Sequence, residues 1–184
     1  MTRQGWVKVW DPLVRGLHWT QAALLMAAWV SAHGWLGWLA WHEVLGECLM
    51  AWVAVRLAWG WLGPRHARFS SFVVRPGAAW RYACQLARGQ APRHLGHNPL
   101  GGWMIVAMLA VLSATLLTGW LFTTDWLWGY AWLAELHEGL AWTLLALAAL
   151  HVLGVLVSSL LHQECLVCAM WHGRKRPPAA GDQA

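Results

Sequence analysis

Four long apolar stretches, separated by more polar connections, dominate the pattern of residues along this chain. Each has about 20 residues, the length that an α-helix needs to cross the hydrocarbon core of a bilayer. We expect helices here because the backbone has to satisfy its own hydrogen bonds in lipid. The predicted spans cover residues 17–39, 42–62, 100–122 and 137–161.

The only long connection runs from Gly63 to Pro99. Within it, the sequence RPGAAWRYACQLARG predicts a short amphipathic helix that lies on a membrane surface. The last residues, 177–184, are small and polar, and we predict a disordered tail there. Residues 1–176 then form a single membrane domain.

Composition excludes an ordinary soluble domain. Hydrophobic residues make up 59% of the 184 positions and charged residues 11%, whereas soluble domains carry about 25% charged residues. Tryptophan occurs 18 times, and tryptophan is enriched where a protein meets the two membrane surfaces. The chain is therefore predicted to be an integral, multi-pass membrane protein.

The basic residues give the orientation of the spans. All 13 precede the first span, lie between the second and third, follow the fourth, or, for Arg56, lie near the inner end of the second. The other two connections carry acidic residues instead. Cytoplasmic loops are enriched in Lys and Arg, so the predicted fold is an all-α, four-helix membrane bundle with both termini in the cytoplasm. Since topology explains the basic loop, we expect no nucleic-acid partner.

Two histidines mark the ends of the apolar segment HEGLAWTLLALAALH, which runs from His137 to His151. Fourteen helical residues leave the two side chains about 40° apart on one face and about 21 Å apart along the axis. That separation is too long for one metal ion. It suits two haems, one near each membrane surface, because imidazole is a common axial ligand of haem iron.

Each haem needs a second ligand at a matching depth. The topology predicts the pairs His18 with His151 near the cytoplasm and His42 with His137 near the periplasm. His33 lies at the same end as His42 and is the alternative to it. A bundle of histidines that only bond to one another across helices is the competing interpretation, but four histidines at two depths favour ligands.

Cys165 and Cys168 are the two cysteines with a suggestive spacing, and His162 and His172 flank them. On a continuous helix these four residues would extend over about 15 Å, which is too long for one tetrahedral metal ion. No histidine follows Cys168 directly, so this is not a c-type haem attachment site. The cysteines do not reveal the compartment.

Several long segments resemble the bacterial cytochrome b561 family, which includes the cytochrome b subunits of nickel–iron hydrogenases. They are KVWDPLVRGLHW, HEVLGECLMAWVAVRLAWGWLGPRHARF, HLGHNPLGGWM and the segment from HEGLAWTLL to the end of the fourth span. The resemblance covers nearly the whole chain. Only HQECLVCAMWHG departs from it, because cysteines stand where the family usually carries an arginine-bearing stretch.

The resemblance implies a four-helix cytochrome of the bacterial inner membrane that holds two haem b groups through histidine pairs. The family's ligand positions match His18, His42, His137 and His151, and His33 matches none of its motifs. Arg15 is a candidate partner of a haem propionate. Arg56 is either a second one or extends to the membrane surface. For His94 and His97, before the third span, contact with a propionate, contact with a quinone and capping by Asn98 all stay open.

Iron with two histidine ligands has no open position for oxygen, so electron transfer is the expected activity. We expect a quinone in the lipid on one side, and a periplasmic redox protein or a small oxidant or reductant on the other. One alternative is a haem-bearing anchor for a periplasmic catalytic subunit such as a hydrogenase. A haem-free transporter with proton-relay histidines is the other. The sequence leaves the oligomeric state, the direction of electron flow and a reaction with superoxide open.

Overall fold

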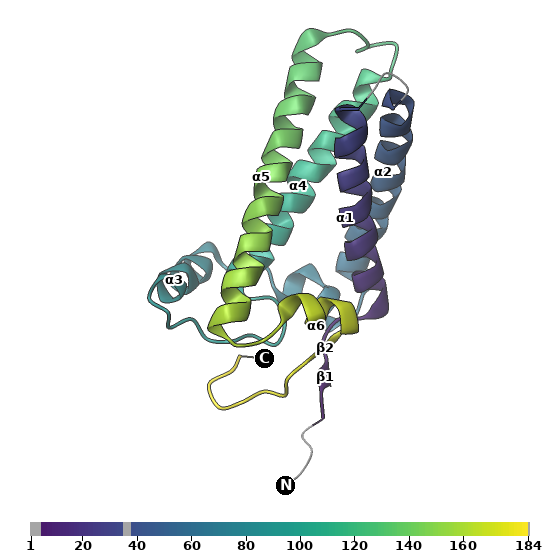
Figure 1. Ribbon diagram of the computed structural model, residues 1–184. Helices are drawn as coiled ribbons and strands as arrows, with labels where there is room; N and C mark the ends of the chain where they lie inside the picture. Colours follow the sequence, from purple (N-terminus) through teal and green to yellow (C-terminus); the bar gives the residue numbers. More distant parts are fainter. Residues whose placement is uncertain (1–4, 35–37, 184) are drawn as a thin grey trace. The chain divides into compact units, whose positions relative to one another are not determined.

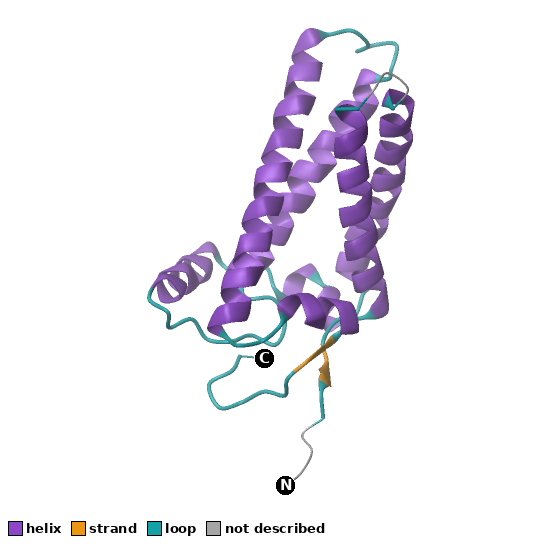
Figure 2. Cartoon of the chain, in the orientation of Figure 1, coloured by secondary structure: helices purple, strands orange, loops and turns teal. Residues whose placement is uncertain are grey.

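The computed structural model describes residues 5–34 and 38–183. The described part of the chain is mostly helical, at 71%, as predicted. In the described part, Figures 1 and 2 show long helices α1, α2, α4 and α5, shorter helices α3 and α6, and one small sheet. Their bounds are α1 Pro12–Ala32, α2 Leu39–Leu62, α3 Pro76–Ala87, α4 Pro99–Phe122, α5 Ala131–Leu161 and α6 Leu166–His172, with strands β1 Val7–Lys8 and β2 Arg174–Lys175.

Three of the described helices, α2, α4 and α5, are long and apolar enough to cross a membrane. Helix α1 has 21 residues but also carries Arg15, His18 and Gln21, and these polar residues lower its mean hydropathy. The first predicted span, residues 17–39, differs from α1, which begins at Pro12 and ends at Ala32, and its last residue, Leu39, is the first residue of α2. Residues 35–37 and Arg3 lie outside the described residues. A bundle of four spans and the cytoplasmic position of both termini stay predictions.

Two of the long helices begin at an Asx cap followed by proline. The Asp11 carboxylate accepts hydrogen bonds from the backbone N–H groups of Leu13 and Val14 at 2.9 and 3.1 Å. The Asn98 side chain accepts one from Gly101 at 2.7 Å. Such caps satisfy N–H groups that the first turn leaves unpaired, and proline has no N–H to satisfy. Capping is therefore one role that Asn98 does have.

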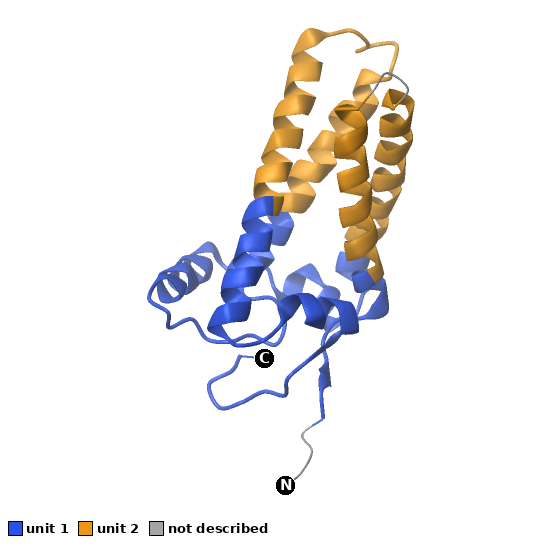
Figure 3. Cartoon of the chain, viewed as in Figure 1, with its two compact units in different colours: residues 1–15, 58–106, 149–184 blue, residues 16–57, 107–148 orange. Residues whose placement is uncertain are grey.

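The chain divides into two compact units, coloured separately in Figure 3. Unit 2 comprises residues 16–57 and 107–148, and so contains segments of α1, α2, α4 and α5. All four segments contribute to one apolar core. Its buried members are Ala28, Leu49, Val53, Leu112, Leu116 and Leu144.

Large apolar side chains also cover the outside of the long helices. Leu117 of α4 is 52% exposed and Leu160 of α5 is 79% exposed. Exposed apolar surface of this extent is unusual in a soluble monomer and marks contact with lipid or with another protein. It therefore supports the assignment of a membrane protein independently of the hydropathy of the sequence.

Unit 1 comprises residues 1–15, 58–106 and 149–184, of which residues 1–4 and 184 are not described. Helix α3 forms inside the segment predicted to be amphipathic. It buries Ala79 and Tyr82 and leaves Trp80 72% exposed. The strands β1 and β2, which the sequence did not suggest, pair antiparallel with Val7 opposite Lys175.

Gly173 ends helix α6 and anchors the N-terminal segment. Its φ of 78° is a left-handed conformation that glycine adopts without strain. Its carbonyl accepts hydrogen bonds from the N–H groups of Val9 and Trp10 at 2.9 and 3.2 Å. A Cβ atom here would lie 2.8 Å from the Trp10 carbonyl oxygen. Glycine is therefore required by both the backbone conformation and the space.

The last residues also make contacts within unit 1. The N–H of Gln183 donates to the Arg93 carbonyl at 2.8 Å, and the Gln183 carbonyl accepts from Leu95 at 3.0 Å. The Asp182 carboxylate pairs with the Arg93 guanidinium. A domain boundary at residue 176 with a disordered tail after it stays a prediction, beside these specific contacts of the tail.

Candidate functional site

Two of the predicted ligands, His42 and His137, lie close together in unit 2. Their ring centroids are 6.1 Å apart and the ring planes are perpendicular. His42 lies in the first turn of α2, and His137 lies two turns into α5. The fold thus brings together two imidazoles that are 95 residues apart in the sequence.

The Nδ1 atom of each ring faces a backbone carbonyl of another helix. His137 Nδ1 lies 2.9 Å from the Thr115 oxygen, and His42 Nδ1 lies 2.8 Å from the Ala28 oxygen. A carbonyl only accepts, so each Nδ1 carries the proton and donates. Each Nε2 is then the nitrogen with a lone pair, which is the form of histidine that binds a metal.

Hydroxyl groups support the same orientation. Thr118 Oγ1 lies 3.1 Å from His137 Nδ1, and Ser31 Oγ lies 3.5 Å from His42 Nδ1. Partners of this kind fix the tautomer and the ring orientation of a histidine ligand, and they make it a better donor. Sequence reasoning missed them because Ala28 and Thr115 act through their backbone, which carries no residue-specific signal.

Gly119 has no side chain, and this lets the His137 ring come close to helix α4. A Cβ atom at this position would lie 2.9 Å from the ring carbon Cε1 of His137. No real side chain tolerates such a distance without movement of the ring. One turn after His42, a Cβ at Gly46 would meet no described heavy atom within 4 Å. The pair therefore combines a tightly held ring with open space along α2.

The donor set of this pair fits haem iron better than it fits a zinc ion. Among the residues that the structure describes, no group of three or more His, Cys, Asp or Glu side chains is placed to hold a metal ion. Zinc sites need three or four protein ligands, whereas haem iron takes its remaining ligands from the macrocycle. The ring centroid distance also leaves room for one metal atom bonded at about 2 Å to each ring.

The other predicted ligands belong to different units. His18 lies in unit 2, where its ring contacts Trp19 at a centroid distance of 5.1 Å, and His151 lies in the unit 1 part of α5. Both side chains are half-buried. The pairing of His18 with His151 stays a prediction.

His33, the alternative to His42, has different neighbours. Its Nδ1 lies 2.9 Å from the Trp29 carbonyl one turn earlier in α1. Its ring packs on the Trp29 ring at a centroid distance of 4.5 Å, and its side chain is exposed. These contacts give His33 a place at the end of α1 that needs no cofactor.

The two arginines predicted to meet propionates lie in different surroundings. Arg15 lies in the first turn of α1, within unit 1, and is half-buried beside Gly173. Arg56 lies in α2, within unit 2, and is only 8% exposed. This burial favours an inward role for Arg56 over extension to the membrane surface.

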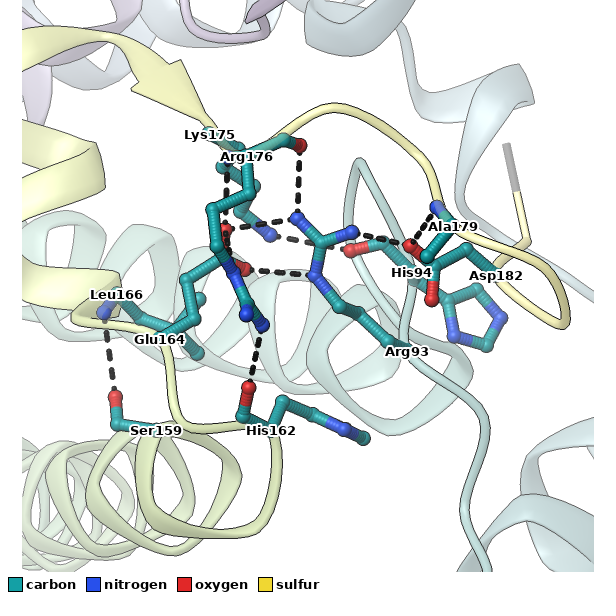
Figure 4. A network of polar contacts seen from close by, with 10 residues as sticks. All are labelled: Arg93, His94, Ser159, His162, Glu164, Leu166, Lys175, Arg176, Ala179 and Asp182. Atoms are coloured by element: carbon teal, nitrogen blue, oxygen red, sulfur yellow. Dashed lines mark hydrogen bonds and ion pairs between the residues drawn. The ribbon is translucent and has the colours of Figure 1, made fainter. Parts of the chain in front are cut away.

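A polar network centred on Arg93 joins three segments of unit 1, as Figure 4 shows: the loop around Arg93, the turn around Glu164 and the C-terminal segment with Arg176 and Asp182. Arg93 donates to both carboxylate oxygens of Glu164 at 3.0 and 2.8 Å, to Asp182, and to the Arg176 carbonyl at 3.0 Å. Burial by itself would raise the pKa of Glu164. The hydrogen bonds from Arg93 and from the Arg176 N–H outweigh burial, so the pKa of Glu164 lies below its usual value.

Lys175 lies beside this network and is 4% exposed. Burial lowers the pKa of Lys175 from 10.5 to about 8, although the nearby Glu164 carboxylate acts in the opposite direction. Its Nζ donates to the His94 carbonyl at 3.2 Å. The pKa of His94 is also lowered, first by burial. His94 is therefore a neutral ring at physiological pH.

Of the two histidines before α4, His94 contacts the ring of Tyr82 at a centroid distance of 5.3 Å, and His97 contacts two aromatic rings. The His97 centroid lies 4.5 Å from that of Trp10 and 4.8 Å from that of Phe72. These contacts connect the N-terminal segment to the loop after α2. Contact of His94 or His97 with a propionate or a quinone stays a prediction.

Cys165 and Cys168 form a disulfide bond with a Cα–Cα distance of 5.2 Å. Both side chains are exposed. Their flanking residues His162 and His172 do not join them in a metal-binding group, since the described residues contain none. In a disulfide, neither sulfur is available as a thiolate ligand for a metal ion, but the bond can be reduced and formed again.

Comparison with models of known protein families gives a match over most of the chain. The family model described as prokaryotic cytochrome b561 matches residues 9–173, which is most of the chain. The matched region contains all four predicted histidine ligands, both arginines and the two cysteines of the disulfide. Searches of curated proteins and of solved structures found no match.

Proposed function

Because the chain belongs to the prokaryotic cytochrome b561 family, and is thus a membrane electron-transfer protein that binds haem b, we propose that it holds two haem b groups. We propose further that it carries electrons across the bacterial inner membrane, between the quinone pool and a periplasmic redox partner. The observation that carries this proposal is the pair His42 and His137, with ring centroids 6.1 Å apart and both Nδ1 atoms bonded to backbone carbonyls.

His42 and His137 are proposed as the axial ligands of the haem nearer the periplasm. Their Nε2 atoms carry the lone pairs, and the carbonyls of Ala28 and Thr115 hold the two rings in place. The hydrogen bonds also raise the basicity of the imidazoles, which stabilises the oxidised over the reduced iron. Haem held by these two histidines would supply a one-electron centre suited to electron transfer rather than to oxygen binding.

His18 and His151 are proposed as the ligands of the second haem, nearer the cytoplasm. Helix α5 is unbroken over both His137 and His151, which is the condition for the separation of about 21 Å along its axis. Arg15 and Arg56 are the proposed partners of haem propionates, because a guanidinium forms strong, charge-assisted hydrogen bonds with carboxylates.

The proposed topology has four spans, with both termini and the segment 63–99 in the cytoplasm. The distribution of all 13 basic residues supports it. It directs the segment 123–136 to the periplasm, where Trp126 and Trp128 are 88% and 73% exposed. Exposed tryptophans here serve either as a membrane-interface belt or as part of a docking surface for the redox partner.

Haem content tests the ligand set directly. The protein purified in detergent is expected to contain two haem b per chain, and the reduced-minus-oxidised spectrum should be that of six-coordinate b haem. Substitution of His18, His42, His137 or His151 by Ala should each remove one haem. His33→Ala is the matched control, because His33 is a histidine in the same region with contacts of its own.

The outcomes separate the alternatives. Folded protein without haem would refute the cytochrome proposal and favour a transporter. Loss of a haem in His33→Ala but not in His42→Ala would keep the function and refute the ligand pairing. If both haems are present but quinol reduces neither, and a periplasmic subunit copurifies, the role as an anchor for that subunit replaces direct exchange with quinone.

A further inference from the structure

The strongest feature outside the proposed haem sites is the disulfide between Cys165 and Cys168 in unit 1. The two residues are separated by two others, and both side chains are exposed. We propose that they form a redox-active site that exchanges its disulfide with a small anionic thiol of the cytoplasm, of the kind that glutathione represents.

The compartment of the cysteine pair indicates a redox role. The segment 162–176 follows the last span and contains Arg174, Lys175 and Arg176, so the proposed topology directs it to the cytoplasm. Cytoplasmic thiols are kept reduced, and disulfides that do form there are usually transient and serve catalysis or redox sensing. This step rests on the topology given under the proposed function; the chemistry of the pair does not depend on haem.

The backbone on both sides of the pair is fixed, which keeps the two sulfur atoms close to each other while their side chains stay exposed. On one side of the pair, the buried Glu164 carboxylate is fixed by Arg93 and by the Arg176 N–H, the latter at 3.1 Å. On the other side, Ala169 of α6 is 4% exposed. The N–H of Leu166 also donates to Ser159 Oγ at 3.3 Å. Reduction therefore opens the sulfur–sulfur bond without releasing the segment that carries it.

The two sulfur atoms differ in their surroundings and therefore in their roles. The N–H of Cys168 donates to Cys165 Sγ at 3.1 Å, and such a donor stabilises negative charge on that sulfur. The thiolate is the nucleophile in disulfide exchange. Cys165 is thus the sulfur that attacks and is attacked, and Cys168 is the resolving sulfur.

The charges near the cysteine pair indicate the charge of the thiol that would react with it. The Arg176 guanidinium donates to the His162 carbonyl at 2.6 Å, so it lies against the turn that leads into Cys165, as Figure 4 shows. Arg174 and Arg176 are exposed, whereas the nearby acidic residue Glu164 is buried and already paired with Arg93. Arg176 Nε also lies 3.8 Å from a Glu164 carboxylate oxygen. Arg93, Arg174, Lys175 and Arg176 nevertheless outnumber Glu164 and Asp182, so the net charge around the cysteines is positive, which favours a thiol that carries carboxylates.

The reaction balances in both directions. In oxidation, the Cys165 thiolate attacks oxidised glutathione, forms a mixed disulfide and releases one glutathione thiolate. The Cys168 thiolate then attacks Cys165 Sγ and releases the second. The pair loses two electrons and two protons, and one oxidised glutathione becomes two reduced ones. In reduction, glutathione thiolate attacks Cys165 Sγ, Cys168 leaves and takes a proton, and a second glutathione completes the exchange.

The test uses the full chain in detergent with Cys48→Ser, so that Cys84 is the remaining lone cysteine and an internal control. The protein is equilibrated in buffers of varied ratio of reduced to oxidised glutathione, quenched with acid and labelled with a maleimide mass tag. We expect two tags to be gained or lost together, in one two-electron transition. A pair that stays as two thiols, or as a disulfide, in every buffer overturns the proposal, as does a Cys165 no more reactive than Cys84.

Single substitutions test the roles of the two sulfurs. Cys168→Ser should accumulate glutathione on Cys165, and Cys165→Ser should accumulate several-fold less on Cys168, as mass spectrometry of the intact chain would show. The reverse ratio overturns the role of Cys165. Reaction with glutathione should be several-fold faster than with neutral mercaptoethanol at low salt, and this difference should shrink at high salt. Equal rates overturn the anionic partner.

Labelling of membrane vesicles separates this proposal from the proposed function. After reduction, a membrane-impermeant maleimide should reach Cys165 and Cys168 in inside-out vesicles and not in right-side-out ones. The opposite result overturns the cytoplasmic site and the topology together. Haem content is measured on the same samples. Exchange with a normal two-electron transition in haem-free protein would leave this inference standing while the proposed function fails.

Discussion

The two compact units differ in the interactions that stabilise each of them internally. Unit 2 has an apolar core to which four helices contribute, and its polar contacts mainly orient two histidine rings. Unit 1 also buries apolar side chains, such as Phe72 and Leu95, and adds a buried network around Arg93, which bonds to residues 71 to 89 positions away in the sequence. Unit 1 thus depends on a few strong, specific polar contacts in addition to its apolar burial, whereas the contacts of the unit 2 core are many, weak and interchangeable.

This difference has consequences for mutation and for function. An apolar core tolerates the exchange of one hydrophobic residue for another of similar volume, whereas a buried ion pair fails when either partner is lost. The histidine pair lies in the unit whose stability is spread over many residues. The cysteine pair lies in the unit whose loops depend on a few charges. The two redox-capable sites should therefore respond to different perturbations.

The largest expected effect comes from Arg93→Ala. This change leaves the buried Glu164 carboxylate without its main partner, and losses of this kind cost about 3–5 kcal/mol. Hydrogen exchange should accelerate at Leu95 and Gln183, whose N–H groups bond across this part of unit 1. Arg88→Ala is the matched control, because Arg88 is exposed and surface changes usually alter stability by under about 0.5 kcal/mol.

The same variant sharpens the comparison between the units. If they are stabilised separately, Arg93→Ala should leave the haem proposed for His42 and His137 at full occupancy. Loss of that haem together with loss of hydrogen-exchange protection at Leu95 would show that the network around Arg93 also supports unit 2. That result would contradict separate stabilisation of the two units.

Acidification should weaken the same network more gently. The pKa of Asp182 is lowered, first by the hydrogen bond from the Ala179 N–H and also by Arg93, and the pKa of Glu164 lies below 4.5. Because both folded values are below the unfolded ones, their contribution to stability is complete above about pH 4.5 and is lost as pH falls through the folded pKa values.

Hydrogen exchange at Gln183, corrected for the intrinsic effect of pH, should show this loss of protection. The double variant Glu164→Gln with Asp182→Asn should start less stable and lack the acid-dependent step. A step of the same size in that variant would assign the acid sensitivity to other groups.

The smallest expected effect tests the histidine pair through the space beside it. Gly119→Ala adds a Cβ atom 2.9 Å from His137 Cε1, and such overpacking costs about 1–3 kcal/mol. We expect lower occupancy or a shifted spectrum for the haem of this pair, with the other haem unchanged. Gly77→Ala is the control, since a Cβ there meets no described atom within 4 Å. Unchanged spectra in Gly119→Ala would mean that the His137 ring moves freely, against the proposed fixed ligand.

The long helices could largely be predicted from sequence because their signal is local. The predicted third span, residues 100–122, differs from α4 by one residue at its start, since Asn98 and Pro99 mark that end by their own chemistry. Helix α5 begins six residues before the predicted start at His137. The segment AWLAEL contains a glutamate that lowers hydropathy without preventing a helix, so a search for apolar residues starts too late.

Unit 1 was harder to predict because its contacts join distant, unremarkable residues. Arg93 is one of several arginines in a loop that the charge pattern marks only as cytoplasmic. Its partners Glu164 and Asp182 are single acids near the C-terminus. The pairing of Val7 with Lys175 involves strands of two residues, too short to leave an alternating pattern in the sequence.

The sequence by itself determined that this is a helical membrane protein of a haem-binding family, where its long helices lie, and which histidines are candidates for ligands. These properties follow from composition, from the length of apolar runs and from residues that act within one turn of a helix. Only the tertiary structure decided that His42 rather than His33 lies beside His137, that backbone carbonyls fix the tautomer of both rings, and that Arg93 gathers the C-terminal segment. Each of these depends on two segments meeting in space, and a carbonyl or an isolated charge carries no mark in the sequence of the partner it will meet.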